Sequence, residues 1–170
     1  MAVAINGVPQ LYGLYPTLNV SADGKQVSTY SLVYTVEAAY QGGVLAPNGD
    51  IHFVPFCATV GQKISSVGLV STYSLVYTAS NAYIGGVLAP NGDIHFVPWA
   101  TVGQKISSAG LVSTYSLVYT VANAYIGGVL APNGDIHFVP LYATVGQKVS
   151  TVTVNLFPQA VCESPWLNKF

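Results

Sequence analysis

The sequence has few charged residues: five Lys and Arg and six Asp and Glu make up 6% of its 170 residues, against roughly 25% in an average soluble domain. With so few basic groups and a net charge of −1, we expect no nucleic-acid partner, because phosphate binding needs a basic patch. No apolar run reaches the roughly 18 residues of a membrane helix, so we expect no membrane insertion. Two cysteines, Cys57 and Cys162, could pair but are too few for a disulfide framework, and we expect two lone buried thiols.

Catalytic motifs are also missing. The sequence holds no nucleophile elbow, phosphate-binding loop or CxxC pair. Its only glutamates, Glu37 and Glu163, belong to no repeated group of residues. We therefore expect no enzyme and no cofactor. The first residues carry neither a basic leader nor a long apolar core, so we expect no signal peptide.

What the sequence does have is an internal repeat. The phrase GGVLAPNGDIHFVP begins at Gly42, Gly85 and Gly127, and VSTYSLVYT begins at Val27, Val70 and Val112. When residues 36–78 are aligned with 79–120, about 36 of 42 paired positions are identical. A period of this length is typical of repeat architectures such as propellers and solenoids.

Each unit contains four short segments rich in Val, Ile, Tyr, Phe and Thr, separated by Gly, Pro and Asn. This pattern predicts strands joined by tight turns and almost no helix. Pro47-Asn48-Gly49 predicts a hairpin turn. Asp50 follows the turn, where its carboxylate can accept backbone N–H groups.

The fold class that we expect is all-β: a β-propeller-like array of four-stranded repeats of about 42 residues. A β-trefoil or prism is the alternative, and an extended β-solenoid is a third. We expect a single all-β repeat domain over 1–170. It consists of N-terminal strands with a closing strand (1–35), three repeats (36–78, 79–120 and 121–157) and a C-terminal tail (158–170).

The phase of the repeat suggests how such an array closes. One copy of VSTYSLVYT precedes the first hairpin at Val27, and the last unit lacks its copy. A spare outer strand at one end and a deficient unit at the other are what closure by strand exchange requires. We expect either four blades in one chain or a larger ring completed by oligomerisation.

The phrase GGVLAPNGDIHFVP resembles the inner hairpin of Kelch-like and related β-propeller repeats. There, a Gly-Gly strand enters a Pro-Asn-Gly turn and leaves through an aromatic strand. The whole unit is similar to propeller-type repeats in proteins of marine phages and other viruses, over about residues 27–150. The resemblance implies a propeller and a virion or other extracellular assembly as the location. The chain departs from the pattern in having three full units.

Three histidines, His52, His95 and His137, recur with the repeat and could bind a metal if they met at an axis. In a propeller, however, their strand would be the second from the axis, which keeps them apart. We therefore expect no metal, and expect each histidine to pack in a hydrogen-bonded pair with the Asp two positions before it. Lys63, Lys105 and Lys148, one in each VGQK, are expected to be solvated charges on a sheet edge.

Aromatic side chains are the remaining candidates for ligand or partner binding. The tyrosines Tyr30, Tyr73 and Tyr115 recur in every unit and suit stacking on sugar rings, although they also suit packing between blades. A second set follows the shared Val-Pro, where the units diverge, and such variable loops often hold specificity: Phe56, Trp99, Leu141 and Tyr142.

The leading functional hypothesis is therefore a non-enzymatic structural or interaction module, such as a phage virion protein. Its expected partners are copies of itself or other structural subunits. A carbohydrate-binding, lectin-like propeller with glycan partners is the alternative. Charge-poor surfaces resist association weakly, which favours an oligomer.

Overall fold

The computed structural model describes residues 3–5, 8–10, 19–20 and 26–151. The chain divides into two compact units, Met1–Leu32 and Val33–Phe170, and each is described by itself. The described residues contain fifteen strands and no helix, so the all-β prediction is confirmed. No helix in these residues is long and apolar enough to cross a membrane.

The described strands of the first unit form two antiparallel pairs. One pair joins β1 (Val3–Ile5) to β2 (Val8–Gln10), and the other joins β3 (Asn19–Val20) to β4 (Gln26–Val27). They are separate two-stranded sheets, so the described part of this unit contains no four-stranded blade.

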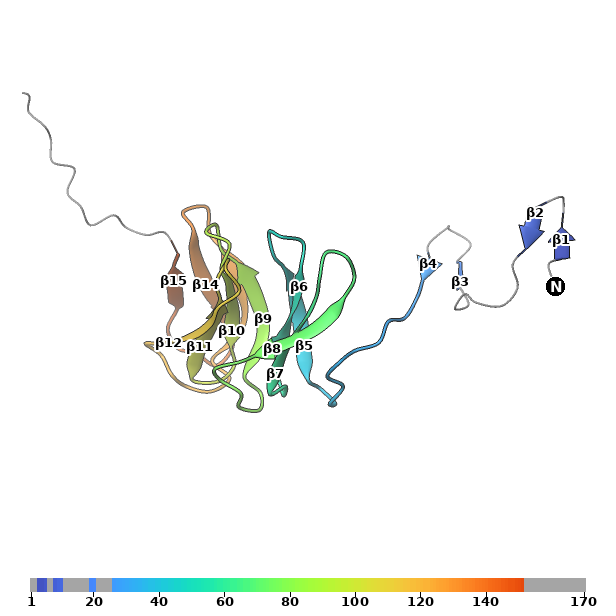
Figure 1. The fold of residues 1–170 in the computed structure, drawn as a ribbon. Coiled ribbons are helices and arrows are strands. Elements are labelled where there is room, and N and C mark those ends of the chain that lie inside the picture. Colours follow the sequence, from blue (N-terminus) through green and yellow to red (C-terminus); the bar gives the residue numbers. More distant parts are fainter. Residues whose placement is uncertain (1–2, 6–7, 11–18, 21–25, 152–170) are drawn as a thin grey trace, which may run out of the picture. The chain divides into compact units, whose positions relative to one another are not determined.

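The second unit contains three antiparallel sheets, which fan out side by side (Figure 1). The first sheet is β5 (Tyr40–Leu45), β6 (Ile51–Pro55), β7 (Val60–Ile64) and β8 (Val70–Ser74). The second is β9 (Tyr83–Leu88), β10 (Ile94–Pro98), β11 (Val102–Ile106) and β12 (Val112–Ser116). The third has only β13 (Tyr125–Leu130), β14 (Asp135–Pro140) and β15 (Gln147–Ser150). We call these sheets blades 1, 2 and 3.

The strands of each blade pair in chain order, as the repeat predicts. The Gly-Gly strands β5, β9 and β13 lie next to one another across the blades, and the VSTYS strands β8 and β12 lie at the opposite edge of their sheets. The histidine strand is therefore the second in each blade, as expected. Blade 3 has no VSTYS strand because its sequence lacks that copy.

The Pro-Asn-Gly turns form as predicted. The N–H of Gly49 donates to the carbonyl of Ala46 at 3.0 Å, and the N–H of Ala46 donates to the carbonyl of Asp50 at 2.8 Å. Gly49 has a φ of +86°, a conformation that costs a glycine little. The Asn48 side chain accepts the N–H of Asp50 at 3.1 Å, which is the turn role typical of Asn.

The core lies between adjacent blades. Each blade has two different apolar faces, and these faces pack against the neighbouring blades. One, the valine face, carries a valine from each of the first two strands, such as Val44 and Val54. The other, the phenylalanine face, carries a Tyr, an Ile and a Phe, such as Tyr83, Ile94 and Phe96. The valine face of blade 1 packs on the phenylalanine face of blade 2. In the same way, the valine face of blade 2 packs on the phenylalanine face of blade 3.

A glycine allows the close approach of the two faces. A Cβ on Gly86 in blade 2 would lie 2.6 Å from Val44 Cγ2, and a Cβ on Gly128 in blade 3 would lie 2.8 Å from Val87 Cγ2. Real Cβ atoms do not approach so closely. The second glycine of the Gly-Gly pair in blades 2 and 3 is therefore required by packing between blades.

Candidate functional site

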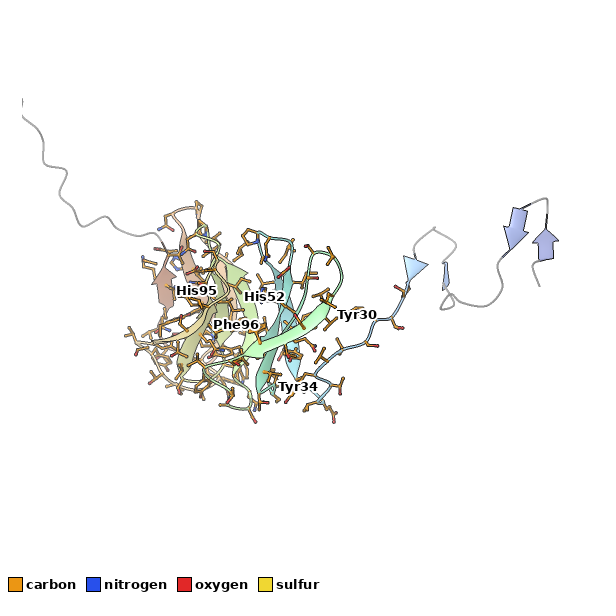
Figure 2. All side chains as sticks on the ribbon, viewed as in Figure 1. Tyr30, Tyr34, His52, His95 and Phe96 are labelled. Atoms are coloured by element: carbon orange, nitrogen blue, oxygen red, sulfur yellow. The ribbon has the colours of Figure 1, made fainter. Side chains whose placement is uncertain are left out.

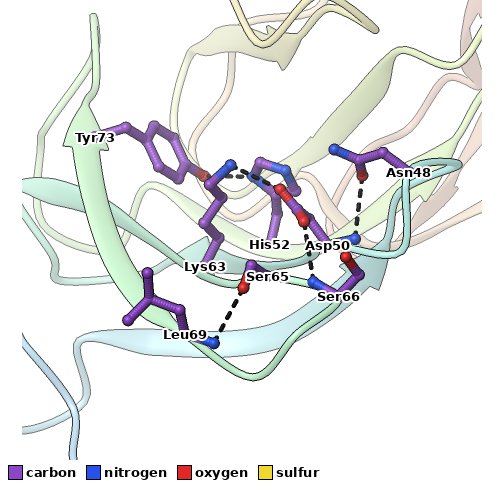
Figure 3. A network of polar contacts seen from close by, with 8 residues as sticks. All are labelled: Asn48, Asp50, His52, Lys63, Ser65, Ser66, Leu69 and Tyr73. Atoms are coloured by element: carbon purple, nitrogen blue, oxygen red, sulfur yellow. Dashed lines mark hydrogen bonds and ion pairs between the residues drawn. The ribbon is translucent and has the colours of Figure 1, made fainter.

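A polar cluster lies at one end of blade 1 (Figure 3). The Asp50 carboxylate accepts the Lys63 ammonium at 2.7 Å and the backbone N–H of Ser66 at 3.2 Å. His52 Nδ1 lies 3.3 Å from the hydroxyl of Tyr73. The cluster ties β6 to both β7 and β8. Asp50 accepts a backbone N–H as expected, but from the next turn along the chain.

The expected Asp–His pair is wrong. In blades 1 and 2 the Asp is bound to a Lys and the His to a Tyr, because the neighbouring strands place better partners opposite each side chain. The expectation for Lys63 is also wrong: β7 lies inside its sheet, and Lys63 is bound to Asp50.

Burial and these bonds shift several pKa values. The hydrogen bond from Lys63 lowers the pKa of Asp50 below its usual value. Burial, assisted by the positive charge of Lys63, lowers the pKa of His52. In blade 2 the same causes lower the pKa of His95 to about 4. Both histidines are therefore neutral at pH 7. The charged groups of each cluster are one lysine and one aspartate, which form an ion pair with each other.

The cluster repeats fully in blade 2 and only in part in blade 3. Asp93 binds Lys105 at 2.7 Å, and His95 Nδ1 lies 3.4 Å from the hydroxyl of Tyr115. Asp135 binds Lys148 in blade 3. His137, however, is exposed, because the strand that would supply its tyrosine is missing from this blade.

The three histidines lie on β6, β10 and β14, in three different blades. Figure 2 labels two of them, His52 and His95. Among the residues that the structure describes, no three His, Cys, Asp or Glu side chains gather as metal ligands would. Cys57 is half-buried beside Asn81, at 3.5 Å from Sγ to Oδ1. Cys162 lies outside the described residues, so the expectation of two lone thiols stays a prediction.

Tyr73 and Tyr115 lie flat over glycines of the neighbouring strand. A Cβ on Gly61 would lie 2.2 Å from the Tyr73 ring, and a Cβ on Gly103 would lie 2.2 Å from the Tyr115 ring. Burial raises the pKa of both tyrosines. Tyr30 is in the first unit and 59% exposed. The structure therefore packs two of these three candidate tyrosines and leaves Tyr30 exposed.

The variable residues follow the histidine strands, and their backbones join the blades. The N–H of Ala82 donates to the carbonyl of Phe56 at 2.9 Å, and the N–H of Asn123 donates to the carbonyl of Trp99 at 2.7 Å. Phe56 and Trp99 are half-buried, whereas Leu141 and Tyr142 are exposed. Each of the four is thus near a blade boundary or at the open end of the array.

Two small cavities lie between blades at the polar clusters. One, of about 290 Å³, is lined by His52 and Lys63 of blade 1 and by Ser107 and Ser108 of blade 2. The other, of about 370 Å³, is lined by His95 and Tyr115 of blade 2 and by Ser150 of blade 3. Their equivalent positions indicate that the cavities follow from the repeat.

A second repeated contact was not anticipated from the sequence. In each blade a glutamine, buried in blades 1 and 2 and half-buried in blade 3, accepts two successive backbone N–H groups from the segment that precedes the blade. Gln62 binds residues 33–34, Gln104 binds 76–77 and Gln147 binds 118–119, at 2.7–3.1 Å. We call these Val-Tyr dipeptides the latches. The glutamine of VGQK and the Val-Tyr of VSTYSLVYT were the signals in the sequence.

The latch tyrosines form the same aromatic contacts in all three blades. Tyr34 lies 6.1 Å from Tyr40, Tyr77 lies 6.3 Å from Tyr83 and Tyr119 lies 6.5 Å from Tyr125, between ring centroids. Blade 1 therefore holds its latch in the same way as the other two blades.

The two ends of the array expose the faces that the blades bury against one another. Val44 and Val54 on the valine face of blade 1 are 8% and 0% exposed, whereas Val129 and Val139 of blade 3 are 59% and 40% exposed. On the phenylalanine face, Ile94 of blade 2 is 2% exposed and Ile51 of blade 1 is 40% exposed. The repeat itself could have indicated this, because identical faces without a neighbour must stay open.

No protein-family model matches the chain, and no curated protein matches it. Among solved structures, it is similar to a streptogramin B lyase, with 22% identity and a TM-score of 0.60 over 76% of this chain and 45% of that one. It is also similar to a catalytically inactive virginiamycin B lyase from Staphylococcus aureus with quinupristin, with 18% identity and a TM-score of 0.53 over 68% and 43%. A selenomethionine form of that lyase gives 19% identity and a TM-score of 0.53 over 65% and 40%.

These lyases are β-propeller proteins, so the propeller-like fold is confirmed. The chain spans less than half of the length of each of them. At such low identity the likeness shows the fold alone. The resemblance to Kelch-like and phage repeats stays a prediction.

Proposed function

We propose that this chain is a non-enzymatic structural module that associates head to tail with a second copy of itself to complete a β-propeller. The observation that carries the proposal is the match between its two ends. The valine face exposed on blade 3 and the phenylalanine face exposed on blade 1 are the same two faces that pack on each other between blades 1 and 2 and between blades 2 and 3.

The contact at the open ends follows from the internal ones. Gly86 and Gly128 receive the valines of the preceding blade. Gly43 holds the same position in blade 1, where the nearest neighbour of a Cβ would be His52 O at 3.4 Å, within its own sheet. Gly43 is therefore open to receive Val129 and Val139 of another copy. An interface between two different faces joins copies head to tail.

The number of copies follows from the number of blades. Propellers typically have about four to eight blades, and each chain supplies three. Two chains give a six-bladed ring, whereas three chains would exceed the usual range. The low charge of the chain leaves little repulsion to oppose this association.

The polar clusters support a structural role over a catalytic one. In blades 1 and 2 each carboxylate is bound to a lysine and each histidine to a tyrosine within the same sheet. Tyr73 and Tyr115 are packed on glycines, which favours a packing role for them over sugar stacking. Sugar binding and a location in a virion stay predictions.

A charge placed on the exposed valine face tests the assembly. Val129→Glu should leave the folded chain intact, because Val129 is largely exposed in one copy, but it should abolish association, because burying an unpaired carboxylate costs several kcal/mol. Sedimentation velocity measures the result. Val118→Glu is the matched control: Val118 is exposed too and lies outside the valine face, so it should sediment as the parent chain does.

A Val129→Glu protein that is folded by circular dichroism and sediments as the parent would contradict the proposed interface. A parent chain that is monomeric at tens of micromolar would contradict the proposed function itself.

A further inference from the structure

We propose that residues 27–31 of one copy form the fourth strand of blade 3 in the next copy, with Tyr30 lying over Gly146 and its hydroxyl reaching His137. This inference rests on the head-to-tail assembly proposed above, and it adds the segment that crosses from one copy to the other.

On the donor side, residues 27–31 have the sequence VSTYS, identical to that of β8 and β12. In both described copies this sequence forms the outermost strand of a blade. Residues 28–31, by contrast, belong to no strand, and Tyr30 is exposed. The same sequence thus forms a strand in blades 1 and 2, where it pairs with β7 and β11. Residues 27–31 do not pair with a blade strand in the described structure.

The latches show which blade such a strand belongs to. Strand β8 lies in blade 1, and the latch that follows it binds Gln104 of blade 2. Strand β12 lies in blade 2, and the following latch binds Gln147 of blade 3. Latch 33–34 binds Gln62 of blade 1. Residues 27–31, which precede that latch, therefore belong to a blade placed before blade 1, and the second copy supplies it.

On the acceptor side, β15 of blade 3 pairs with β14 along one edge, and no described strand pairs with the other. Strands β7 and β11 at the same position pair with β8 and β12. The matching registers place Tyr73 opposite Gly61 and Tyr115 opposite Gly103. Transferred to β15, this register places Tyr30 opposite Gly146 and Ser31 opposite Val145.

Blade 3 has space for Tyr30 and a polar partner for its hydroxyl. A Cβ on Gly61 or Gly103 would lie 2.2 Å from a tyrosine ring, whereas one on Gly146 would meet no atom of the described residues within 4 Å. His52 lies within hydrogen-bond distance of the Tyr73 hydroxyl, and His95 within that of the Tyr115 hydroxyl. His137, by contrast, is exposed. Glycine and histidine are thus retained in blade 3 where a tyrosine would complete the cluster.

A disulfide between two different copies tests the register. In a background with Cys57→Ser and Cys162→Ser, a Ser31→Cys chain is coexpressed with a differently tagged Val145→Cys chain. Residues opposite each other on antiparallel strands have Cα atoms about 4.5–5.5 Å apart, within the range for a disulfide. After mild oxidation we expect a disulfide-linked heterodimer, carrying both tags, on a non-reducing gel.

The control is coexpression of Ser28→Cys with Val145→Cys, which lies three positions out of register and should give at least tenfold less heterodimer. Equal yields from both pairs, or no heterodimer from Ser31→Cys with Val145→Cys, would overturn the strand donation. The second result would be expected if residues 152–170 occupied the edge of β15 instead. The sedimentation of the unlinked parent separates the two proposals: an oligomer without the link overturns only the strand donation, whereas a monomer overturns both.

Discussion

The three repeated histidines show how the neighbours of a residue determine its role. The sequence around each is the same, IHFVP, but His95 is buried beside Tyr115 and His137 is exposed. The difference arises from a strand that blade 2 has and that the described part of blade 3 lacks. A histidine in this repeat is thus a packing residue when its blade is complete.

The buried histidines make stability depend on pH. Burial lowers the pKa of His95 to about 4, whereas a histidine in the unfolded chain titrates near 6.5. Between these values the unfolded chain binds more protons than the folded one. The free energy of unfolding should therefore fall as pH decreases from about 6.5 towards 4, by roughly 2–3 kcal/mol for this residue.

Urea unfolding at a series of pH values measures this dependence. His95→Gln, which does not titrate, should flatten the decrease, and the same substitution at the exposed His137 is the matched control for the removal of a histidine. An unchanged slope in His95→Gln would refute the assignment of the pH dependence to the burial of this histidine.

At the scale of the strands, the VSTYS strand and the VGQK strand fit each other through one tyrosine and one glycine. Gly61→Ala should destabilise the chain by about 1–3 kcal/mol, a typical cost of overpacking, because the new Cβ would collide with the Tyr73 ring. Gly146→Ala should change the stability of the single chain little, because a Cβ there meets no atom of the described residues within 4 Å.

Thermal unfolding of the two variants, measured with Val129→Glu added to keep the chain monomeric, makes this comparison. Equal losses of stability at Gly61 and Gly146 would show that the tyrosine is not the cause. Without Val129→Glu, the Gly146→Ala variant should also weaken association, because Tyr30 of the next copy would meet the new methyl group.

Much of the fold could be predicted from the sequence at this scale. The alternation of β-forming residues and the Pro-Asn-Gly turns predicted the strands, their order within a blade and the absence of helix in the described residues. The sequence could not predict the partners of Asp50 and His52, because these depend on the register between β6, β7 and β8. Nor could it predict the bond from Gln62 to the latch, which joins residues 28 and 29 positions apart.

The candidate site could be predicted less well. The pattern of His, Asp and Tyr indicated which side chains recur, but only the packing of blade on blade decides which copies are buried. Phe53 and Phe96 lie in identical phrases that begin at Gly42 and Gly85, and among the blades that the structure describes only Phe96 of these two packs on a preceding blade. Residues that are exposed in one blade but buried at the equivalent position of another therefore mark where a neighbouring blade is absent from the described structure.

For the whole molecule, the central claim is that three blades are half of a ring. In an array of repeats each unit is stabilised mainly by its neighbours, and among the described residues of the second unit the first and last blades each pack on only one other blade. Val129 and Val139 at one end and Ile51 at the other expose apolar surface, which is costly in water and which an identical second copy can cover.

Native mass spectrometry of the unmodified 170-residue chain tests this claim most directly. We expect a single species at tens of micromolar with twice the 17.8 kDa mass of the chain, since two sets of three blades close one ring. A species of one chain mass, or an open series of masses without a dominant dimer, would contradict the account.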